Sequence, residues 1–356
     1  GSTPSTRPQA VTLCRRGNSG LSAANCQLRF YDTGLVFDVP DMVANEGQTG
    51  IQVRAVRTEG SPEQACVPAF ENVTRDVNFW SDYINPDSKG VSVTPAVSVN
   101  GNAVGGSPAS PTAVALAFGR GGVAEIDVNY PDAGRMQLNA TYQGSAANSD
   151  QGLTMPGADQ FVSRPVGFCI EAPSADAACA SPLANCSVLT AAGDPFDLRI
   201  RAVAHESGGN GNLCSGNATT QNFRAALDLG HSLVAPSPVD DGGVPGALGK
   251  DEVTFAQVDD GEVTLAQSVS EVGVFTFSVP SGQPYLSTTL SGSDSADIGR
   301  FIPASFQVTS GAVDPGQLEA ECVIAGGGDF QYIGQPMGWA LPPSVPIVAL
   351  NRQGTV

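Results

Sequence analysis

Cysteines, histidines and carboxylates are the side chains of this sequence whose types and spacing could carry chemistry. The chain has 8 Cys and only 2 His, and no two cysteines form a C-x-x-C pair. A tetrahedral zinc site needs closely spaced thiolate and imidazole ligands, so zinc is not indicated. The cysteines are therefore expected to form disulfides, which places the protein in an oxidising compartment.

The disulfide pairing is predicted from loop length and symmetry, since eight cysteines allow 105 connectivities. Two pairs close short polar loops. The other two pairs each join the middle of one of two repeated sequence modules to the far end of that module. Closing a short loop removes little freedom from the unfolded chain, so the first two act as local staples. The predicted pairs are Cys14–Cys26, Cys179–Cys186, Cys66–Cys169 and Cys214–Cys322.

The two histidines do not indicate a catalytic centre. A nucleophilic triad needs a base held between a nucleophile and an orienting group. His205 ends an apolar strand pattern and His231 lies in a Leu-Gly-His-Ser turn. The pair His205-Glu206 also lacks the second histidine of H-E-x-x-H. No catalytic residue is predicted, and a hydrolase that uses two carboxylates is left as the least favoured alternative.

Acidic turns offer the oxygen ligands that calcium prefers. They lack the spaced twelve-residue pattern of an EF-hand, and acidic turns are also the ordinary surface of a chain with a formal net charge of -18. No cofactor is predicted, and calcium is kept as an alternative. The candidate ligands are Asp240, Asp241, Asp259, Asp260, Asp294 and Asp297.

Aromatic side chains are candidates for stacking against sugar rings. The densest clusters contain Trp80 with Tyr83, and Tyr332. Core packing is the competing role, because such rings bury large areas. These three residues are the candidate ligand contacts.

Composition and charge limit the class of protein. Gly 42 and Pro 26 separate short runs rich in Val, Ile, Thr and Phe, a pattern typical of β structure, with short helical segments expected only near residues 76–83 and 316–321. The net charge of -18 opposes binding to nucleic acid. The sequence contains no run of eighteen apolar residues, so no membrane insertion is expected. The expected disulfides predict an extracellular or cell-surface protein that is secreted through the periplasm.

An internal repeat organises the chain. The segment Ile51–Gly60 recurs as Leu198–Ser207 and, more weakly, as Val345–Gly354, and the alanines at positions 55, 202 and 349 keep a constant spacing. Alternating strands with Gly, Asn and Asp turns predict a mainly β fold of tandem Ig-like antiparallel β-sandwich modules. Core positions are predicted at Val53, Ala55, Ile200, Ala202, Phe275 and Phe277.

The repeat also predicts the domain layout. Residues 309–356 begin a third β module and stop short, so these strands must pack on the second module or be completed by another segment. The expected divisions are an N-terminal disulfide loop (1–26), module one (27–170), a linker (171–187), module two (188–308) and the incomplete third module (309–356).

Several blocks, in order along nearly the whole chain, carry a family resemblance. They include Leu35–Asp41, Cys66–Phe70, Tyr130–Arg135, Phe161–Phe168 and Gly299–Pro303. The chain resembles the C-terminal region of the MSHA (mannose-sensitive haemagglutinin) pilus biogenesis protein Q family. The resemblance implies a secreted protein at a type IV pilus, at its tip, that acts in attachment and contacts pilin or minor pilin subunits. It supplies no catalytic motif.

The sequence thus predicts a non-enzymatic structural and adhesive protein at the pilus or cell surface. The alternative is a lectin-like module that binds a surface glycan, either directly or through a bound calcium ion.

Overall fold

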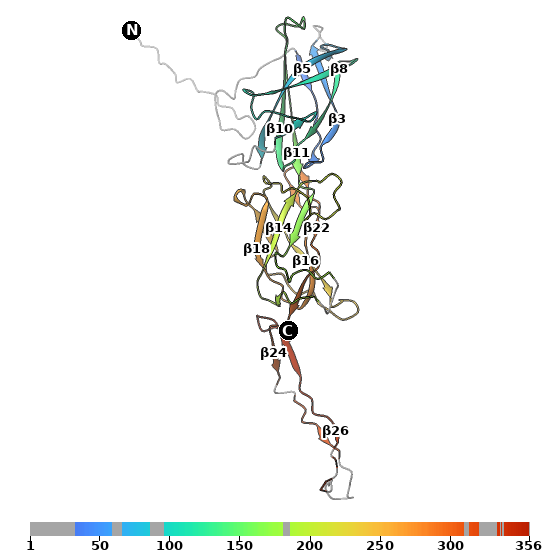
Figure 1. The fold of residues 1–356 in the computed structure, drawn as a ribbon, viewed down its shortest axis with the longest axis vertical. Helices are drawn as coiled ribbons and strands as arrows, with labels where there is room; N and C mark the ends of the chain where they lie inside the picture. Colours follow the sequence, from blue (N-terminus) through green and yellow to red (C-terminus); the bar gives the residue numbers. More distant parts are fainter. Residues whose placement is uncertain are drawn as a thin grey trace, which may run out of the picture.

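The computed structural model describes residues 33–58, 66–85, 96–180, 186–309, 313–319, 333–334, 336 and 338–355. Two β-sandwich modules are stacked end to end, and a long hairpin extends from the second module away from the first (Figure 1). The predicted Cys14–Cys26 disulfide, Cys322 and Tyr332 lie outside the described residues. In the described part of the chain, no helix is long and apolar enough to span a membrane.

Two sheets form the first module. The first runs in the order β1-β3-β9-β6-β7, with β4 also paired to β3, and the second runs β2-β11-β10-β5-β8. Side chains alternate between core and solvent along strands such as β8, as expected for sheets with one buried face. The first sheet contains β1 (Thr33–Val36), β3 (Gln48–Thr58), β4 (Cys66–Pro68), β6 (Ser98–Val99), β7 (Asn102–Ala103) and β9 (Val123–Asn129). The second contains β2 (Met42–Val43), β5 (Val73–Asn85), β8 (Thr112–Phe118), β10 (Gly134–Gln143) and β11 (Thr154–Arg164).

The second module repeats this plan with a smaller first sheet, β12-β14-β18, facing a sheet of order β13-β23-β19-β16. The first sheet contains β12 (Gly167–Glu171), β14 (Phe196–Val203) and β18 (Glu262–Gln267). The second contains β13 (Thr190–Ala191), β16 (Gly230–Ala235), β19 (Gly273–Val279), β22 (Ser293–Asp294) and β23 (Ile298–Ile302). Two short pairs, β15 (Ala225–Asp228) with β17 (Glu252–Phe255) and β20 (Pro284–Tyr285) with β21 (Thr288–Thr289), complete it.

The fold class is as predicted: tandem Ig-like β-sandwiches with two separate hydrophobic cores. The side chains predicted to face these cores are each at most 1% exposed, namely Val53, Ala55, Ile200, Ala202, Phe275 and Phe277.

The predicted helix at 76–83 is wrong, because these residues lie within strand β5. Val77, Phe79 and Ser81 are buried and alternate with more exposed neighbours, which is the two-residue period of a strand. In the second expected helix, Gln317 and Leu318 form strand β25 instead. Among the described residues the one helical turn is the 3₁₀ segment Gln257–Asp259.

The boundary between the modules lies earlier than the predicted residue 170. Strand β12 pairs with β14 of the second module, and Phe168 and Ile170 are buried in the second core. The linker expected at 171–187 therefore follows the first strand of module two. The error arose because β11 continues almost directly into β12, so the chain passes from one module to the next without a change in composition.

The C-terminal segment forms a hairpin. Strand β24 (Ser305–Val308) pairs with β27 (Ile347–Leu350), and β25 (Gln317–Leu318) pairs with β26 (Trp339–Leu341) further along. The third unit thus begins at residue 305, a few residues before the expected 309. In the described part of the chain, neither strand pair carries a further strand.

Candidate functional site

A groove of about 610 Å³ lies along one side of the second module. Strand β12 forms one wall through Phe168, Ile170 and Glu171. The opposite wall is the segment 292–298, which includes β22 and leads into β23, and residues 172–178 and 211–214 also line the groove. This volume falls within the range of small-ligand sites, which is about 300–1,000 Å³.

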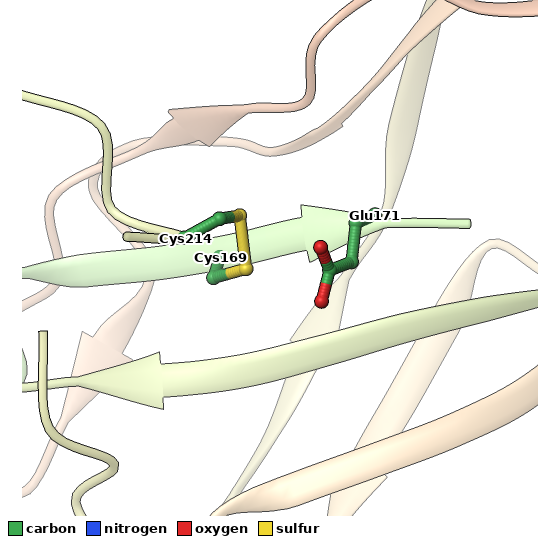
Figure 2. Close-up of side chains that lie close together, drawn as sticks. All are labelled: Cys169, Glu171 and Cys214. Atoms are coloured by element: carbon green, nitrogen blue, oxygen red, sulfur yellow. A yellow bond between two sulfur atoms is a disulfide. The ribbon is translucent and has the colours of Figure 1, made fainter. Parts of the chain in front are cut away.

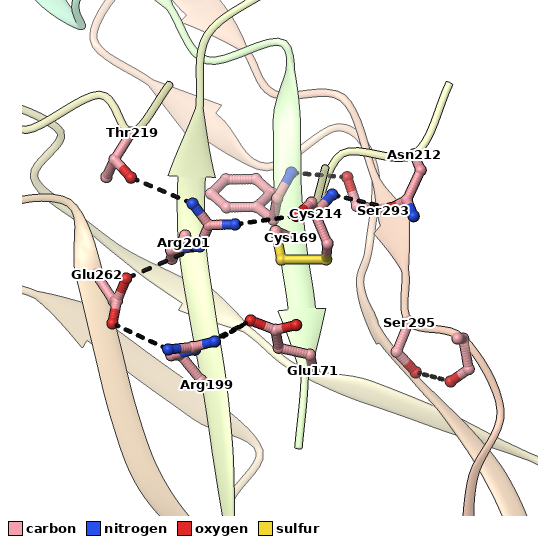
Figure 3. Close-up of a disulfide and its surroundings, with 12 residues drawn as sticks. Cys169, Glu171, Arg199, Arg201, Asn212, Cys214, Thr219, Glu262, Ser293 and Ser295 are labelled. Carbon is pink, nitrogen blue, oxygen red and sulfur yellow. Dashed lines mark hydrogen bonds and ion pairs between the residues drawn. A yellow bond between two sulfur atoms is a disulfide. The ribbon is translucent and has the colours of Figure 1, made fainter. Parts of the chain in front are cut away.

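Strand β12 reaches the groove because it is an edge strand of its sheet. Strand β12 pairs with β14 along one of its two edges, and no further described strand of this sheet pairs with its other edge. On the other edge, the Phe168 N–H donates to Ser293 Oγ at 2.9 Å, so the backbone groups of this edge face the groove wall (Figure 3). The sequence Gly-Phe-Cys-Ile-Glu of β12 buries Phe168 and Ile170 in the core and places Cys169 and Glu171 on the outer face.

A disulfide between Cys169 and Cys214 fixes the loop after β14 over this outer face (Figure 3). The predicted pairs Cys66–Cys169 and Cys214–Cys322 are therefore wrong. The prediction assumed that the two modules carry equivalent cysteines. They do not at this position: Cys169 lies opposite Arg201 of β14, whereas the residue opposite the corresponding Arg54 of β3 in module one is Val36. The predicted Cys179–Cys186 disulfide is present.

Charged side chains surround the disulfide in complementary pairs. Arg199 on β14 forms an ion pair with Glu171, and Glu262 on β18 lies 3.9 Å from Arg199 and 3.8 Å from Arg201 (Figure 3). Arg201 also donates to the Cys214 carbonyl at 3.4 Å, which holds the loop at the disulfide. The Glu171 charge is thereby compensated by Arg199.

The ion pair of Glu171 with Arg199 is half-exposed, with side chains 33% and 36% accessible. Exposed pairs contribute little stability, because water and salt screen them. We expect Glu171→Gln to change the free energy of unfolding by less than about 1 kcal/mol. Urea unfolding of the two proteins measures this difference. A loss of several kcal/mol would show that Glu171 supports the fold in another way.

Among the described residues, one group of three potential metal ligands comes together: Cys169, Glu171 and Cys214, whose ligand atoms lie within 4.8 Å of one another (Figure 2). Both sulfur atoms are bonded in the disulfide, so no thiolate is available to a metal. This group is a structural crosslink beside a carboxylate.

The six candidate calcium ligands fall in three separate places. Asp240 and Asp241 accept hydrogen bonds from Ser237, and Asp259 accepts from the Ala256 N–H, so these carboxylates organise their own turns. Asp260 follows Asp259 in a left-handed conformation. Asp294 and Asp297 line the groove, so these two of the six belong to the site.

Trp80 and Tyr83 do not form one sugar-binding surface. They lie three residues apart on β5, so their side chains point to opposite faces of the sheet. The Tyr83 hydroxyl lies 3.1 Å from the Ala133 carbonyl and 3.3 Å from that of Asn222, at the junction between the modules. Tyr83 is thus a junction residue, while Trp80 is partly exposed on the other face.

The junction is built around a carboxylate. Asp132, which follows β9 in module one, is 1% exposed, and its Oδ1 accepts the N–H groups of Ala133 (2.7 Å) and Asn222 (3.0 Å). Asn222 belongs to module two, and its side chain donates to the Tyr130 hydroxyl at 3.4 Å. Among the described residues, Asp132 Oδ2 has no hydrogen-bond partner. Sequence reasoning missed this site, since its two halves are 90 residues apart.

Burial changes the electrostatics of the junction. Removal of the carboxylate from water raises the pKa of Asp132 from 3.8 to about 6, while the two backbone donors and Arg224 oppose the shift. Burial also raises the pKa values of Tyr83 and Tyr130, with a further rise from the nearby Asp132 charge. The junction therefore contains a costly ionised group at neutral pH.

Backbone hydrogen bonds also join the two modules at this junction, where Ala44 links β11 of module one to His205 of module two. The Ala44 N–H donates to the Arg164 carbonyl at 2.7 Å, and the His205 N–H donates to the Ala44 carbonyl at 2.8 Å. Asn45 Nδ2 adds a bond to the His205 carbonyl at 3.0 Å. His205 thus contributes its backbone to module packing. The second histidine, His231, contacts the Pro245 carbonyl through Nε2 at 2.8 Å.

Fold and junction together define a protein of in-line Ig-like modules that are stapled by disulfides. Three family models match the chain in succession: "Domain of unknown function (DUF6701), first Ig-like domain" over residues 11–158, its second domain over 164–268 and its third domain over 271–356. The chain therefore belongs to the DUF6701 family. No curated protein matches it in sequence. The resemblance to the pilus biogenesis family stays a prediction.

Several solved structures show distant similarity. Invasin, a bacterial integrin-binding protein, is 12% identical with a TM-score of 0.27, over 78% of this chain and 42% of that chain. A C-terminal intimin fragment in complex with the intimin-binding domain of its receptor is 12% identical with a TM-score of 0.31, over 76% and 66%. The α2-macroglobulin of E. coli is 14% identical with a TM-score of 0.25, over 81% and 19%. The chain thus spans less than two thirds of the invasin chain and of the intimin fragment.

Proposed function

We propose that this chain is a non-enzymatic, extracellular structural and adhesive component of a type IV (MSHA-like) pilus, which acts in attachment to a surface or host. The observation that carries the proposal is the fixed, in-line junction between the two modules. The buried contact of Asp132 with Asn222 and the backbone bond from His205 to Ala44 join the two modules into one stalk (Figure 1). A stalk of this kind projects a binding surface away from its anchor.

The oxidised cysteines support an extracellular place, because the Cys169–Cys214 and Cys179–Cys186 disulfides persist only where thiols are not kept reduced. The assignment to a pilus rests on the sequence blocks that resemble the MSHA biogenesis family. Pilin or minor pilin subunits are the partners that this resemblance implies.

We propose the groove beside β12 as the contact site for the surface ligand. It offers partly exposed apolar side chains at Ala172, Ala178 and Leu213 and polar groups at Ser293, Asp294 and Asp297. Polar groups above an apolar floor are the usual composition of a recognition site. The lectin-like alternative uses the same groove, with Asp294 and Asp297 as hydrogen-bond acceptors for sugar hydroxyls or as calcium ligands.

Attachment of bacteria that carry the full natural protein tests the proposal. We expect deletion of the gene to reduce attachment and Asp294→Lys/Asp297→Lys to reproduce the loss, because two acceptors of the groove are replaced by cations. The matched control, Asp240→Lys/Asp241→Lys, makes the same charge change in an exposed loop outside the groove and is expected to attach normally.

Two further measurements separate the parts of the proposal. Crosslinking on intact pili is expected to join the protein to a pilin, and its absence from purified pili would contradict the pilus assignment. Attachment with and without a chelator distinguishes a calcium-dependent ligand from a direct one. If both groove and control variants attach normally, the groove is not the contact site.

A further inference from the structure

Module two differs from module one at the strand edge that forms the groove. Strands β1 and β12 correspond, because each pairs with the strand that carries the repeated alanine, Ala55 in β3 and Ala202 in β14. Residues 37–41 connect β1 to β2, whereas residues 172–189 connect β12 to β13. The longer connection of module two lines part of the groove, and the Cys179–Cys186 disulfide closes it on itself.

In module one the same edge is covered. The Thr33 hydroxyl of β1 donates to the Thr154 carbonyl of β11 at 2.8 Å, and a side chain at Gly157 of β11 would collide with the Leu35 carbonyl oxygen. The two strands therefore pack directly on each other. In module two, β22 and β23 pair with β19 as β11 pairs with β10, but between them and β12 the seam opens into the groove of about 610 Å³.

The open edge of β12 leaves buried backbone groups without a partner. The Phe168 N–H points away from β14 and donates to the Ser293 hydroxyl, which lies beside this edge (Figure 3). Because backbone groups alternate in direction along an antiparallel strand, Ile170 directs its N–H and carbonyl to the same side. Ile170 is 3% exposed and lines the groove, and among the described residues neither group has a hydrogen-bond partner there. Such a donor and acceptor are costly to leave unpaired.

The charge of the groove indicates the chemistry of its ligand. The charged residues of the described lining are three carboxylates, Glu171, Asp294 and Asp297. Arg199 compensates Glu171, whereas neither aspartate has an ion pair in the described part of the chain. Contacts of an ion pair are shorter than the screening length of about 8 Å at 0.15 M salt, so the groove attracts a cationic group and repels an anionic one.

We propose that the ligand of the groove is an extended peptide segment of a partner protein, which carries lysine or arginine and adds as a strand to the open edge of β12. The inference rests on the proposed function, since it takes the groove to be the contact site and names the chemistry of the ligand. Main-chain hydrogen bonds to Ile170 hold the peptide, and its basic side chains pair with Asp294 and Asp297. In strand addition of this kind, main-chain bonds supply affinity and side chains supply specificity.

Calorimetric titration of the purified chain at about 0.15 M salt tests the proposal. The probes are eight-residue peptides, blocked at both ends, in which Lys alternates with Val, Thr or Leu. We expect at least one of them to bind with a dissociation constant below about 1 mM, and the matching peptides with Glu in place of Lys to show no binding.

Two double variants locate the binding site. Asp294→Lys/Asp297→Lys is expected to weaken binding of the Lys peptide at least about tenfold, because two ion pairs are replaced by repulsion. Asp240→Lys/Asp241→Lys has the same net charge and is expected to bind as the wild type does. This control separates the groove from the general attraction of a cation to a chain of formal charge -18. Circular dichroism melting checks that both variants are folded.

Methylation of the peptide backbone separates strand addition from charge attraction alone. Methyl groups on every backbone nitrogen of the Lys peptide remove its N–H donors and keep its charge, so binding is expected to weaken at least about tenfold. The inference is wrong if no Lys peptide binds, if the methylated peptide binds equally well, or if both double variants weaken binding alike.

The proposed function fails in a different way. Bacteria with Asp294→Lys/Asp297→Lys that lose attachment, while the purified wild-type chain binds no Lys peptide, would keep the groove as the contact site and overturn only its peptide ligand. Peptide binding that the same variant abolishes, together with normal attachment of the variant bacteria, would support strand addition at β12 and remove the groove from attachment.

Discussion

Asp132→Asn is expected to stabilise the protein at neutral pH. The pKa of Asp132 is raised from 3.8 to about 6 in the folded chain, so the folded state binds its proton more tightly than the unfolded state does. The stability contributed by this group is therefore complete below about pH 4, falls as the pH rises from 4 to 6, and stays low above 6. Each pKa unit corresponds to 1.36 kcal/mol, so the ionised group costs about 2 to 3 kcal/mol at pH 7.5.

Asparagine removes this charge and keeps the acceptor. Its carbonyl oxygen can still accept the N–H groups of Ala133 and Asn222, which hold the two modules together. The amide nitrogen would take the place of Oδ2, which has no partner among the described residues, at a smaller cost than a buried charge. We expect a higher melting temperature at pH 7.5 and no gain below pH 4.

Calorimetry across pH 3.5 to 8 measures this effect on the transition that breaks the junction. Asp76→Asn is the matched control, because Asp76 is an exposed aspartate on β5 of the same module. The control is expected to leave the pH profile unchanged. If Asp132→Asn melts at a lower temperature than the wild type at pH 7.5, the ionised carboxylate stabilises the junction, and its burial is not the dominant electrostatic effect.

Removal of the Cys169–Cys214 disulfide is expected to cost more stability than removal of Cys179–Cys186. The two cysteines of the first are 45 residues apart and those of the second are 7 apart. In the chain-entropy treatment, a longer closed loop restricts the unfolded chain more, which gives about 4 kcal/mol for the first and about 2 kcal/mol for the second. Cys169 is also 1% exposed, so its replacement by alanine leaves space in a packed region.

Denaturant unfolding of Cys169→Ala/Cys214→Ala and Cys179→Ala/Cys186→Ala measures both losses. Each double variant avoids a free thiol, and each serves as the control for the other because both remove one disulfide of module two. The long-loop variant is expected to show the lower unfolding midpoint with a similar slope. Equal losses, or a larger loss for the short loop, would show that loop closure does not govern the stability of this module.

The sequence by itself determined the class of the fold. Strict alternation of apolar and polar residues fixes strands with one buried face, so Val53, Ala55, Ile200 and Phe275 were identified as core residues. The constant spacing of Ala55, Ala202 and Ala349 revealed the modules, because a repeated structural unit keeps its internal register. The helix predicted at 76–83 failed because β5 is buried at every second residue between two neighbouring strands, and this tertiary packing outweighs local preference.

Only the tertiary structure decided which distant residues meet. Cys169 pairs with Cys214 because the loop after β14 folds back over β12, and symmetry of spacing carries no information about a loop's path. Asp132 and Asn222 belong to two different modules, so the residue pattern of either module alone could not predict their contact. The groove likewise joins β12 to residues 292–298, more than a hundred positions away. Short-range periodicity reports which face of a strand is buried, whereas the sites of this protein depend on which edges and loops are brought together.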